Sequence, residues 1–184
     1  MKILVIGANG QVGHEFLKLS KQRSDNIICL DRQGLDLSDE GEITKVMAEI
    51  LPDLVINCAA YTAVDKAETE PEVALVVNSR SPELIAIACA KNNAAMIHLS
   101  TDYVFGGESE TPYSESDEVG PTGVYGKTKL SGELFVAACL ERHIILRTSW
   151  VFGTHGNNFM KTMLRLGADC DHLDVVADQL GAPT

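Results

Sequence analysis

The sequence is short of positive charge. It has 15 Lys and Arg residues against 26 Asp and Glu, and its formal net charge at pH 7 is −11. Its basic residues are dispersed along the chain, whereas nucleic-acid-binding surfaces need Lys and Arg gathered against the phosphates. We therefore expect no nucleic-acid partner, although a helix N-terminus can still bind a small anion locally.

Paired cysteines and long hydrophobic runs are also missing. The five cysteines stand at positions 29, 58, 89, 139 and 170, and no two of them form a CxxC pair. This odd, scattered set predicts reduced thiols in a cytoplasmic protein, with no zinc site and no disulfide framework. No stretch approaches the roughly 20 apolar residues that span a bilayer, so no membrane contact is expected. The apolar start of the chain leads into a glycine turn and not a cleavage site, which indicates a first strand and not a signal peptide.

Short apolar runs alternate with helical stretches along the whole chain. The expected strands are 2–6, 26–30, 54–58, 95–100 and 143–149, and the expected helices are 11–22, 39–50 (capped by Ser38), 71–92 and 123–141. Nearly continuous apolar strands are typical of a parallel sheet buried on both faces. The long polar segment 104–122, rich in Gly and Pro, is expected to be a functional lid or binding loop.

Three glycines mark a candidate cofactor site. The stretch "GANGQVG" places Gly7, Gly10 and Gly13 between the first expected strand and the first expected helix. Glycine permits a tight turn there and lets the backbone approach a pyrophosphate on the helix N-terminus. A glycine-rich turn without a ligand is the alternative, and the position after a strand favours the dinucleotide. We expect a Rossmann-like α/β fold, a doubly wound parallel sheet with helices on both faces, in one domain of residues 1–184.

Acidic residues after the second strand bear on the choice of cofactor. Asp31 could accept hydrogen bonds from an adenosine ribose, which favours NAD, whereas Arg32 could meet a 2′-phosphate, which favours NADP. Arg32 could equally be a solvated loop charge, so the choice between NADH and NADPH stays open. Asp36 and Leu37 precede the next helix and could border the adenine, or simply cap that helix.

The carboxyl end of the fourth strand carries groups suited to proton transfer. "LSTDYVF" places hydroxyl groups at the end of the fourth strand, where open α/β sheets bind ligands. Downstream, Tyr125 and Lys129 are four residues apart and should share one helix face. We expect the Lys129 ammonium to lower the pKa of Tyr125, so that the tyrosine can act as a general acid or base. A YxxxK pair alone is often a chance match, and the dinucleotide motif before it favours a catalytic pair.

These motifs resemble the extended branch of the short-chain dehydrogenase/reductase superfamily, and among its members the bacterial dTDP-4-dehydrorhamnose reductase family. The resemblance rests on the order and spacing of "GANGQVG", "NCAAYTAVDKAE", "LSTDYVF", "PYSESDEVGPTGVYGKTKLSGE", "RTSWVFG" and "DQLGAPT". It implies NADH- or NADPH-dependent reduction of the C4 ketone of dTDP-4-dehydro-L-rhamnose to dTDP-L-rhamnose, a nucleotide sugar used for cell-surface polysaccharide.

The resemblance also implies roles for individual residues. Tyr125 would protonate the C4 alkoxide, Lys129 would hold the nicotinamide ribose, and Thr101 would hydrogen-bond the substrate oxygen. The implied cofactor-binding residues are Gly7, Asn9, Gly10, Gln11, Val12, Gly13, Asp31, Arg32, Asp36, Leu37, Ala59, Ala60, Tyr61 and Thr62. The implied substrate-binding residues are Val64, Asp102, Tyr103 and Trp150; simple packing is the alternative for Val64, Tyr103 and Trp150. Glu15 matches a position that some members use for magnesium (Mg2+) at a homodimer interface, and a solvated glutamate is the alternative.

The chain departs from the family at a few points. Cys58 and Gly106 replace an expected alanine and an expected aspartate. Family members also continue for roughly a hundred residues, so we expect most of the substrate-binding part to be absent and turnover to be slight. Two alternatives remain. A sugar-nucleotide epimerase or dehydratase would hold oxidised cofactor tightly, and a dehydratase would carry an acidic pair after Thr101. A non-catalytic dinucleotide-binding regulatory subunit would have less need of the catalytic set.

Overall fold

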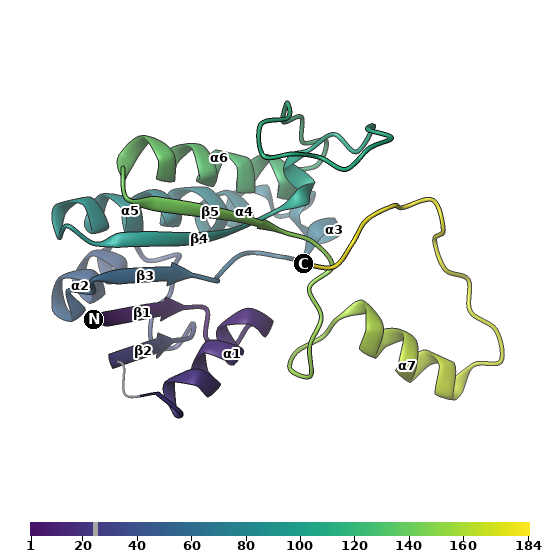
Figure 1. The fold of residues 1–184 in the computed structure, drawn as a ribbon, viewed down its shortest axis with the longest axis horizontal. Helices are drawn as coiled ribbons and strands as arrows, with labels where there is room; N and C mark the ends of the chain where they lie inside the picture. The colour runs from purple at the N-terminus through teal and green to yellow at the C-terminus, as the bar shows by residue number, and fades with distance from the viewer. Residues whose placement is uncertain (24–25) are drawn as a thin grey trace.

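A single parallel sheet organises the chain. The computed structural model describes residues 1–23 and 26–184, and in these ranges five strands lie in the order β2-β1-β3-β4-β5 (Figure 1). The strands are β1 (Lys2–Ile6), β2 (Asn26–Leu30), β3 (Leu54–Asn57), β4 (Ala95–Thr101) and β5 (His143–Thr148). Each lies where the sequence predicts it, with no end displaced by more than one residue. The strand order reverses beside β1, which is where sheets of this kind bind ligands.

Helices cover the sheet on both faces. α1 (Gln11–Ser20), α2 (Glu40–Ile50), α5 (Ser81–Lys91) and α6 (Val124–Cys139) follow the predicted pattern. Alternate residues of a strand point to opposite faces. Leu4 and Ile6 therefore share one buried core with Ile43 of α2, Ile85 of α5 and Val136 of α6, while Val5 is buried outside that core. α1 packs beside β1 and β2. The fold is thus the predicted Rossmann-like α/β architecture.

The cap of α2 differs from the prediction. Asp39, and not Ser38, caps the helix, because the Asp39 carboxylate accepts a hydrogen bond from the Glu42 backbone N–H at 3.0 Å. Ser38 instead donates its N–H and its hydroxyl to the Asp36 carboxylate. A carboxylate at the helix N-terminus is favoured by both the free N–H groups and the helix dipole.

The predicted helix 71–92 is three joined segments. α4 (Pro71–Leu75) continues into the π-helical turn η1 (Val76–Arg80) and then into α5. Both prolines that complicated the prediction lie in the first turn of a segment, where no intrahelical N–H is required. The π turn is wider, and a new run of α-helical hydrogen bonds begins after it, just before Pro82. The helix therefore remains continuous.

The same run bears on the expectation about membranes. Among the described residues, Pro71–Lys91 is long and apolar enough to cross a membrane by length and composition alone, contrary to the expectation that no stretch is. This is weak evidence, because core helices pass the same test. Here 44% of the tested window is buried inside the fold, and Ile85, Ala86 and Cys89 belong to the core beside the sheet.

Three short elements were not predicted. They are α3 (Val64–Ala67), the 3₁₀ turn η2 (Asp102–Val104) and α7 (Phe159–Asp169). α7 stands apart from the sheet (Figure 1), and none of its described residues is buried. After α7 the chain returns to the strand ends, where the Thr184 N–H donates to the Ser149 carbonyl at 3.0 Å.

Candidate active site

A cleft of about 960 Å³ lies at the carboxyl ends of the strands. Segments far apart in the sequence form its walls: the glycine turn, the end of β2, the loop after β3, the end of β4 and the start of α6. All residues predicted to bind cofactor or substrate or to act in catalysis line the cleft, except Gly13. Gly13 packs against the glycine turn beneath it. The structure therefore brings the predicted set together.

The glycine turn is shaped for close contact. Gly7 has a positive φ of 89°, and a Cβ there would come within 2.7 Å of the Ala59 backbone nitrogen. A Cβ on Gly13 would collide with the Gly7 carbonyl oxygen, so Gly13 lets α1 pack directly onto the turn. Gly10 is the N-cap of α1, and no described side chain caps that helix. The first N–H groups of α1 therefore face the cleft, which suits a pyrophosphate.

Asp31 is held in position at the end of β2. Its Oδ1 accepts hydrogen bonds from the backbone N–H groups of Gln33 and Gly34, at 3.0 and 3.2 Å. Its Oδ2 accepts from the Asn9 side chain at 2.7 Å. Arg32 is largely exposed and its guanidinium lies 3.5 Å from the Asp36 carboxylate. The carboxylate is thus fixed at the rim and the guanidinium beside it is solvated, so neither NADH nor NADPH is favoured decisively.

The loop after β3 is clamped from below by one buried asparagine. Asn78, in the π turn η1, accepts from the Tyr61 N–H at 2.8 Å and donates to the Tyr61 carbonyl at 3.1 Å. It also donates to the Thr128 hydroxyl in α6 at 3.2 Å. Asn78 thereby ties the cleft-lining stretch Ala59, Ala60, Tyr61 and Thr62 to α6, the helix that carries Tyr125 and Lys129. Sequence reasoning missed it, although a polar Asn-Ser pair inside an apolar helix was a signal.

α6 delivers Tyr125 and Lys129 to the cleft. The helix passes so near η2 that a Cβ on Gly126 would collide with the Tyr103 carbonyl oxygen. Tyr125 is 9% exposed and Lys129 is 1% exposed. Lys129 donates from Nζ to the Leu99 carbonyl oxygen of β4 at 2.6 Å. The pair therefore lies on one buried helix face, as its spacing predicts.

The electrostatics of this pair differ from the prediction. Burial raises the pKa of Tyr125 above its usual value, a hydrogen bond with Thr101 opposes this, and the charge of Asp102 adds to it. Burial also lowers the pKa of Lys129 to about 8. The prediction that Lys129 lowers the pKa of Tyr125 is therefore wrong for this structure, because removal from water is the largest effect on the tyrosine. A raised pKa favours the protonated form of Tyr125 at neutral pH.

Thr101 and Asp102 sit at the end of β4. Thr101 is buried, accepts from the Tyr103 N–H at 3.2 Å and donates to the Asp102 carboxylate at 3.1 Å. Burial raises the pKa of Asp102, against the effect of these hydrogen bonds. The end of β4 and the start of η2 thus hold a hydroxyl and a carboxyl group next to Tyr125.

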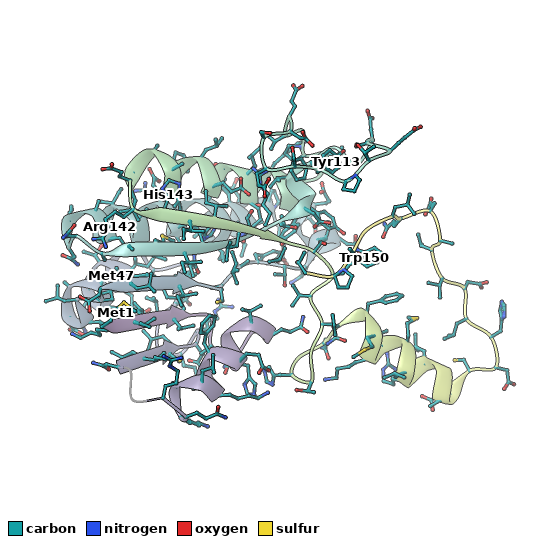
Figure 2. The ribbon with its side chains drawn as sticks, in the orientation of Figure 1. Met1, Met47, Tyr113, Arg142, His143 and Trp150 are labelled. Atoms are coloured by element: carbon teal, nitrogen blue, oxygen red, sulfur yellow. The ribbon has the colours of Figure 1, made fainter. Side chains whose placement is uncertain are left out.

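The residues predicted to bind substrate lie on the open side. Tyr103 is 49% exposed and meets the Tyr125 ring edge-on at 5.5 Å. Trp150 is 52% exposed, so it is not a core residue, and Figure 2 shows it where β5 leaves the sheet toward the C-terminal segment. Val64 begins α3 and lines the cleft. A substrate role for the three stays a prediction.

Other predicted features lie away from the chemistry. Glu15 pairs with Lys18 at 2.8 Å on the exposed face of α1, and among the described residues no group of three or more His, Cys, Asp or Glu side chains could hold a metal. The magnesium hypothesis thus has no support here. Burial raises the pKa of Cys58 to about 12, which makes its thiol inert at neutral pH.

The 104–122 loop stands beside α6. Phe105 stacks on Tyr113 with ring centroids 4.2 Å apart, and the Arg147 guanidinium lies 4.9 Å from the centroid of the Phe105 ring. Figure 2 shows Tyr113 within this loop, to the right of α6. Gly106, one of the departures from the family, lies here too. The role of the loop as a lid stays a prediction.

Comparison with known proteins extends over the whole chain. A family model described as "RmlD substrate binding domain" matches residues 1–184. The dTDP-4-dehydrorhamnose reductase of Sinorhizobium fredii is 46% identical over 184 residues, which are 100% of this chain and 62% of that protein.

Two solved structures share the arrangement. A dTDP-4-dehydrorhamnose reductase from Clostridium acetobutylicum superposes with a TM-score of 0.96 at 47% identity, over 100% of this chain and 65% of that one. The Bacillus anthracis dTDP-4-dehydrorhamnose reductase in complex with NADP has a TM-score of 0.95 at 40% identity, over 100% of this chain and 66% of that one. The chain therefore spans somewhat less than two thirds of the length of these proteins.

Proposed function

The chain belongs to the RmlD substrate binding domain family, and from that premise we propose that it carries the cofactor site and the proton donor of an NAD(P)H-dependent dTDP-4-dehydrorhamnose reductase. The reaction is reduction of the C4 ketone of dTDP-4-dehydro-L-rhamnose to dTDP-L-rhamnose. The observation that carries this proposal is a buried tyrosine, with its pKa raised by burial, in a cleft that a glycine turn also lines. Relatives named for this reaction, one of them solved with NADP, support it.

The residues present fit a dinucleotide. The space that a Cβ on Gly7 would fill and the uncapped N-terminus of α1 suit the pyrophosphate. Asp31 suits the adenosine ribose, and its neighbour Arg32 could turn from Asp36 toward a 2′-phosphate. The loop held by Asn78 would border the nicotinamide half.

Bound NAD(P)H would supply the hydride. Tyr125 supplies the proton to the oxygen that becomes the C4 hydroxyl, because its raised pKa keeps it in the acid form. The Thr101 hydroxyl lies beside it and would turn from Asp102 to hydrogen-bond the same oxygen. Lys129 lies one helical turn on from Tyr125, with its amine against the end of β4, where it would meet the nicotinamide ribose.

The substrate and its setting follow from the same premise. Asp102, Tyr103 and Trp150 would contact the sugar, and Val64 would border it. All five cysteines, each within the described residues, are free thiols, which supports a cytoplasmic location. A homodimer remains part of the proposal, and it awaits measurement of the mass in solution.

Two measurements test the proposal in order. Calorimetric titration with NADH and with NADPH should show binding by the 184-residue chain, while Gly7→Val should abolish it, because the new Cβ meets Ala59. Binding of neither cofactor by the unaltered chain would refute the cofactor site. Oxidation of NAD(P)H that depends on dTDP-4-dehydro-L-rhamnose should be slight for this chain. It should be clear for a chain continued to the length of the relatives, and its absence there would refute the reaction.

A further inference from the structure

The helix that carries Tyr125 has no side chain of its own at its N-cap. α6 begins at Val124 and its N-cap is Gly123, so the first N–H groups need a partner from elsewhere. The C-cap residue of α3, Glu68, provides one. Its carboxylate accepts the Val124 N–H at 2.7 Å, across a separation of 56 residues in the sequence. α6 is therefore capped from α3.

Gly123 leaves room for this contact. A Cβ on Gly123 would come within 3.0 Å of Glu68 Oε1, so a larger residue there would press on the carboxylate. Both the free N–H groups and the positive end of the helix dipole favour a negative charge at this point. Glu68 thus does for α6 what Asp39 does for α2, but from a different element.

α3 is itself held in place beside the cleft. The backbone of Tyr61 is clamped by Asn78, and its hydroxyl donates to the Glu70 carboxylate at 2.6 Å. The same carboxylate lies 2.8 Å from Nζ of Lys66 in α3. Glu68 stands between Lys66 and Glu70 in the sequence, so the cap comes from a segment that is fixed to the loop after β3.

The placement of Tyr125 depends on this first turn of α6, because Tyr125 directly follows Val124. Its side chain packs in a small buried cluster that includes Ala67 of α3. On the other side of the turn, a Cβ on Gly126 would collide with the Tyr103 carbonyl oxygen. The turn is therefore held between α3 and η2, and Glu68 contributes the hydrogen bond from α3.

We propose that Glu68 is a positioning residue for Tyr125: by capping α6 from α3, its carboxylate fixes the turn from which the tyrosine hydroxyl reaches the cleft. Its importance for turnover rests on the proposed function, in which Tyr125 gives a proton to the substrate oxygen. Proton transfer needs donor and acceptor at hydrogen-bond distance, and a displacement of about 1 Å slows such a step markedly. Loss of the cap should therefore act on the chemical step more than on binding.

The hydrogen bond can be observed by NMR in the 184-residue chain. An amide proton that donates to a carboxylate resonates downfield, so Glu68→Ala should move the Val124 amide signal upfield and shift the Tyr125 ring signals with it. Glu68→Gln keeps a side-chain oxygen that can accept, and should leave both sets of signals near their original positions. A Val124 or Tyr125 signal that does not respond to Glu68→Ala would overturn the proposal. So would movements as large in Glu68→Gln, because they would report lost charge and not a lost cap.

The effect on turnover is measured in the chain continued to the length of its relatives. Glu68→Ala should lower kcat by about three- to thirtyfold, with KM for the sugar nucleotide and the affinity for NADPH unchanged. Glu68→Gln should recover most of the lost kcat. A kcat equal to that of the unaltered protein, or a loss confined to KM, would contradict the positioning role.

Glu72 offers a matched control. It is another exposed glutamate close to α3, in the first turn of α4, and among the described residues it has no hydrogen bond or ion pair with another element. Glu72→Ala should leave the Val124 and Tyr125 signals and kcat unchanged. A fall in kcat as large as that of Glu68→Ala would show a general effect of lost negative charge and would refute the proposal.

The two kinds of measurement fail separately. The NMR spectra need no cofactor and no substrate, so if the continued chain does not reduce the ketone, the proposed function falls and the spectra still decide whether Glu68 places Tyr125. Conversely, unresponsive signals in a chain whose continued form is active would remove this proposal and keep the proposed function. If Glu68→Ala does not fold, acid titration of the unaltered chain decides: the Val124 amide signal should move upfield as carboxylates are protonated, and a constant position would overturn the cap.

Discussion

The half of the molecule around β4 and α6 differs sharply from the segment that follows Trp150. In the first, even a lysine and a histidine are buried, and Lys129 and Asn78 make hydrogen bonds to other elements. In the second, Phe159 and Leu164 of α7 are 67% and 70% exposed. The comparison teaches that the sheet and the helices packed on it position Tyr125 and most of the cleft. Residues after Trp150 depend much less on the sheet for their placement.

The largest effect is expected from removing the Tyr125 hydroxyl in the first region. Tyr125→Phe should lower kcat of the extended chain by about 10²- to 10⁴-fold, because the ring remains and the proton donor is lost. Trp150→Phe, in the open region, should act mainly on KM for the sugar nucleotide. Steady-state assays give kcat and KM for each variant, and cofactor affinity is measured in parallel. An equal fall in kcat for both variants would show that the two regions do not differ in this way.

The pH dependence of the free energy of unfolding tests how far Lys129, in the first region, is removed from water. Burial lowers the Lys129 pKa from 10.5 to about 8, so the folded state releases a proton that the unfolded chain still holds between these values. Stability relative to Lys129→Met should therefore rise by about 3 kcal/mol from pH 8 to above pH 10.5, and this gain is lost as the pH falls through 8. Urea unfolding of both proteins at intervals of one pH unit gives this difference in stability. Identical pH profiles for the two proteins would show that the Lys129 pKa is not lowered in the folded state.

A pair of helical glycines tests packing. A Cβ on Gly132 of α6 would collide with the Asn78 carbonyl oxygen, so Gly132→Ala should destabilise the fold by about 1–3 kcal/mol. No described atom lies within 4 Å of a Cβ on Gly167 of α7, so Gly167→Ala should be neutral or stabilise α7 by up to about 1 kcal/mol. Denaturant midpoints compare the two, and similar losses would show that α7 is packed in solution.

A pair of helix caps should give the smallest difference. Asp39 caps α2 and Asn158 caps α7, each by accepting a backbone N–H at 3.0 Å. Asp39→Ala should cost the whole fold about 1 kcal/mol, because α2 packs into the core. Asn158→Ala should weaken α7 by a similar amount, seen as faster amide exchange in that helix while the global denaturant midpoint stays unchanged. A shifted global midpoint for Asn158→Ala would show that α7 unfolds together with the sheet.

The strands and the cofactor turn were predictable because their signals are local. A buried parallel strand reads as an apolar run, and a glycine turn after it reads as a phosphate site, so 2–6 and Gly7, Gly10 and Gly13 needed no tertiary information. α7 was missed because no described part of the fold buries it. The cap of α2 was misplaced by one residue, since Ser38 and Asp39 are both good caps by type.

The electrostatics of the site could not be read from spacing. The i, i+4 distance places Tyr125 and Lys129 on one face, but their pKa values depend on how far the sheet removes both from water. Asn57 and His98 come from separate strands, and only the parallel register that sets Asn57 beside His98 joins them. Such a contact is invisible until the strand order is known.

The π turn at Val76–Arg80 changes which faces the two halves of the continuous helix α4–η1–α5 turn toward the rest of the fold. The extra residue that it inserts rotates α5 relative to α4 about their common axis. Ala74 of α4 can thus pack with Ala67 and Tyr125 in a small cluster under the cleft, while Ile85 of α5 packs in the main core. Deleting one residue from the turn should leave a regular helix with these two halves out of step, so one of the two clusters would have to come apart.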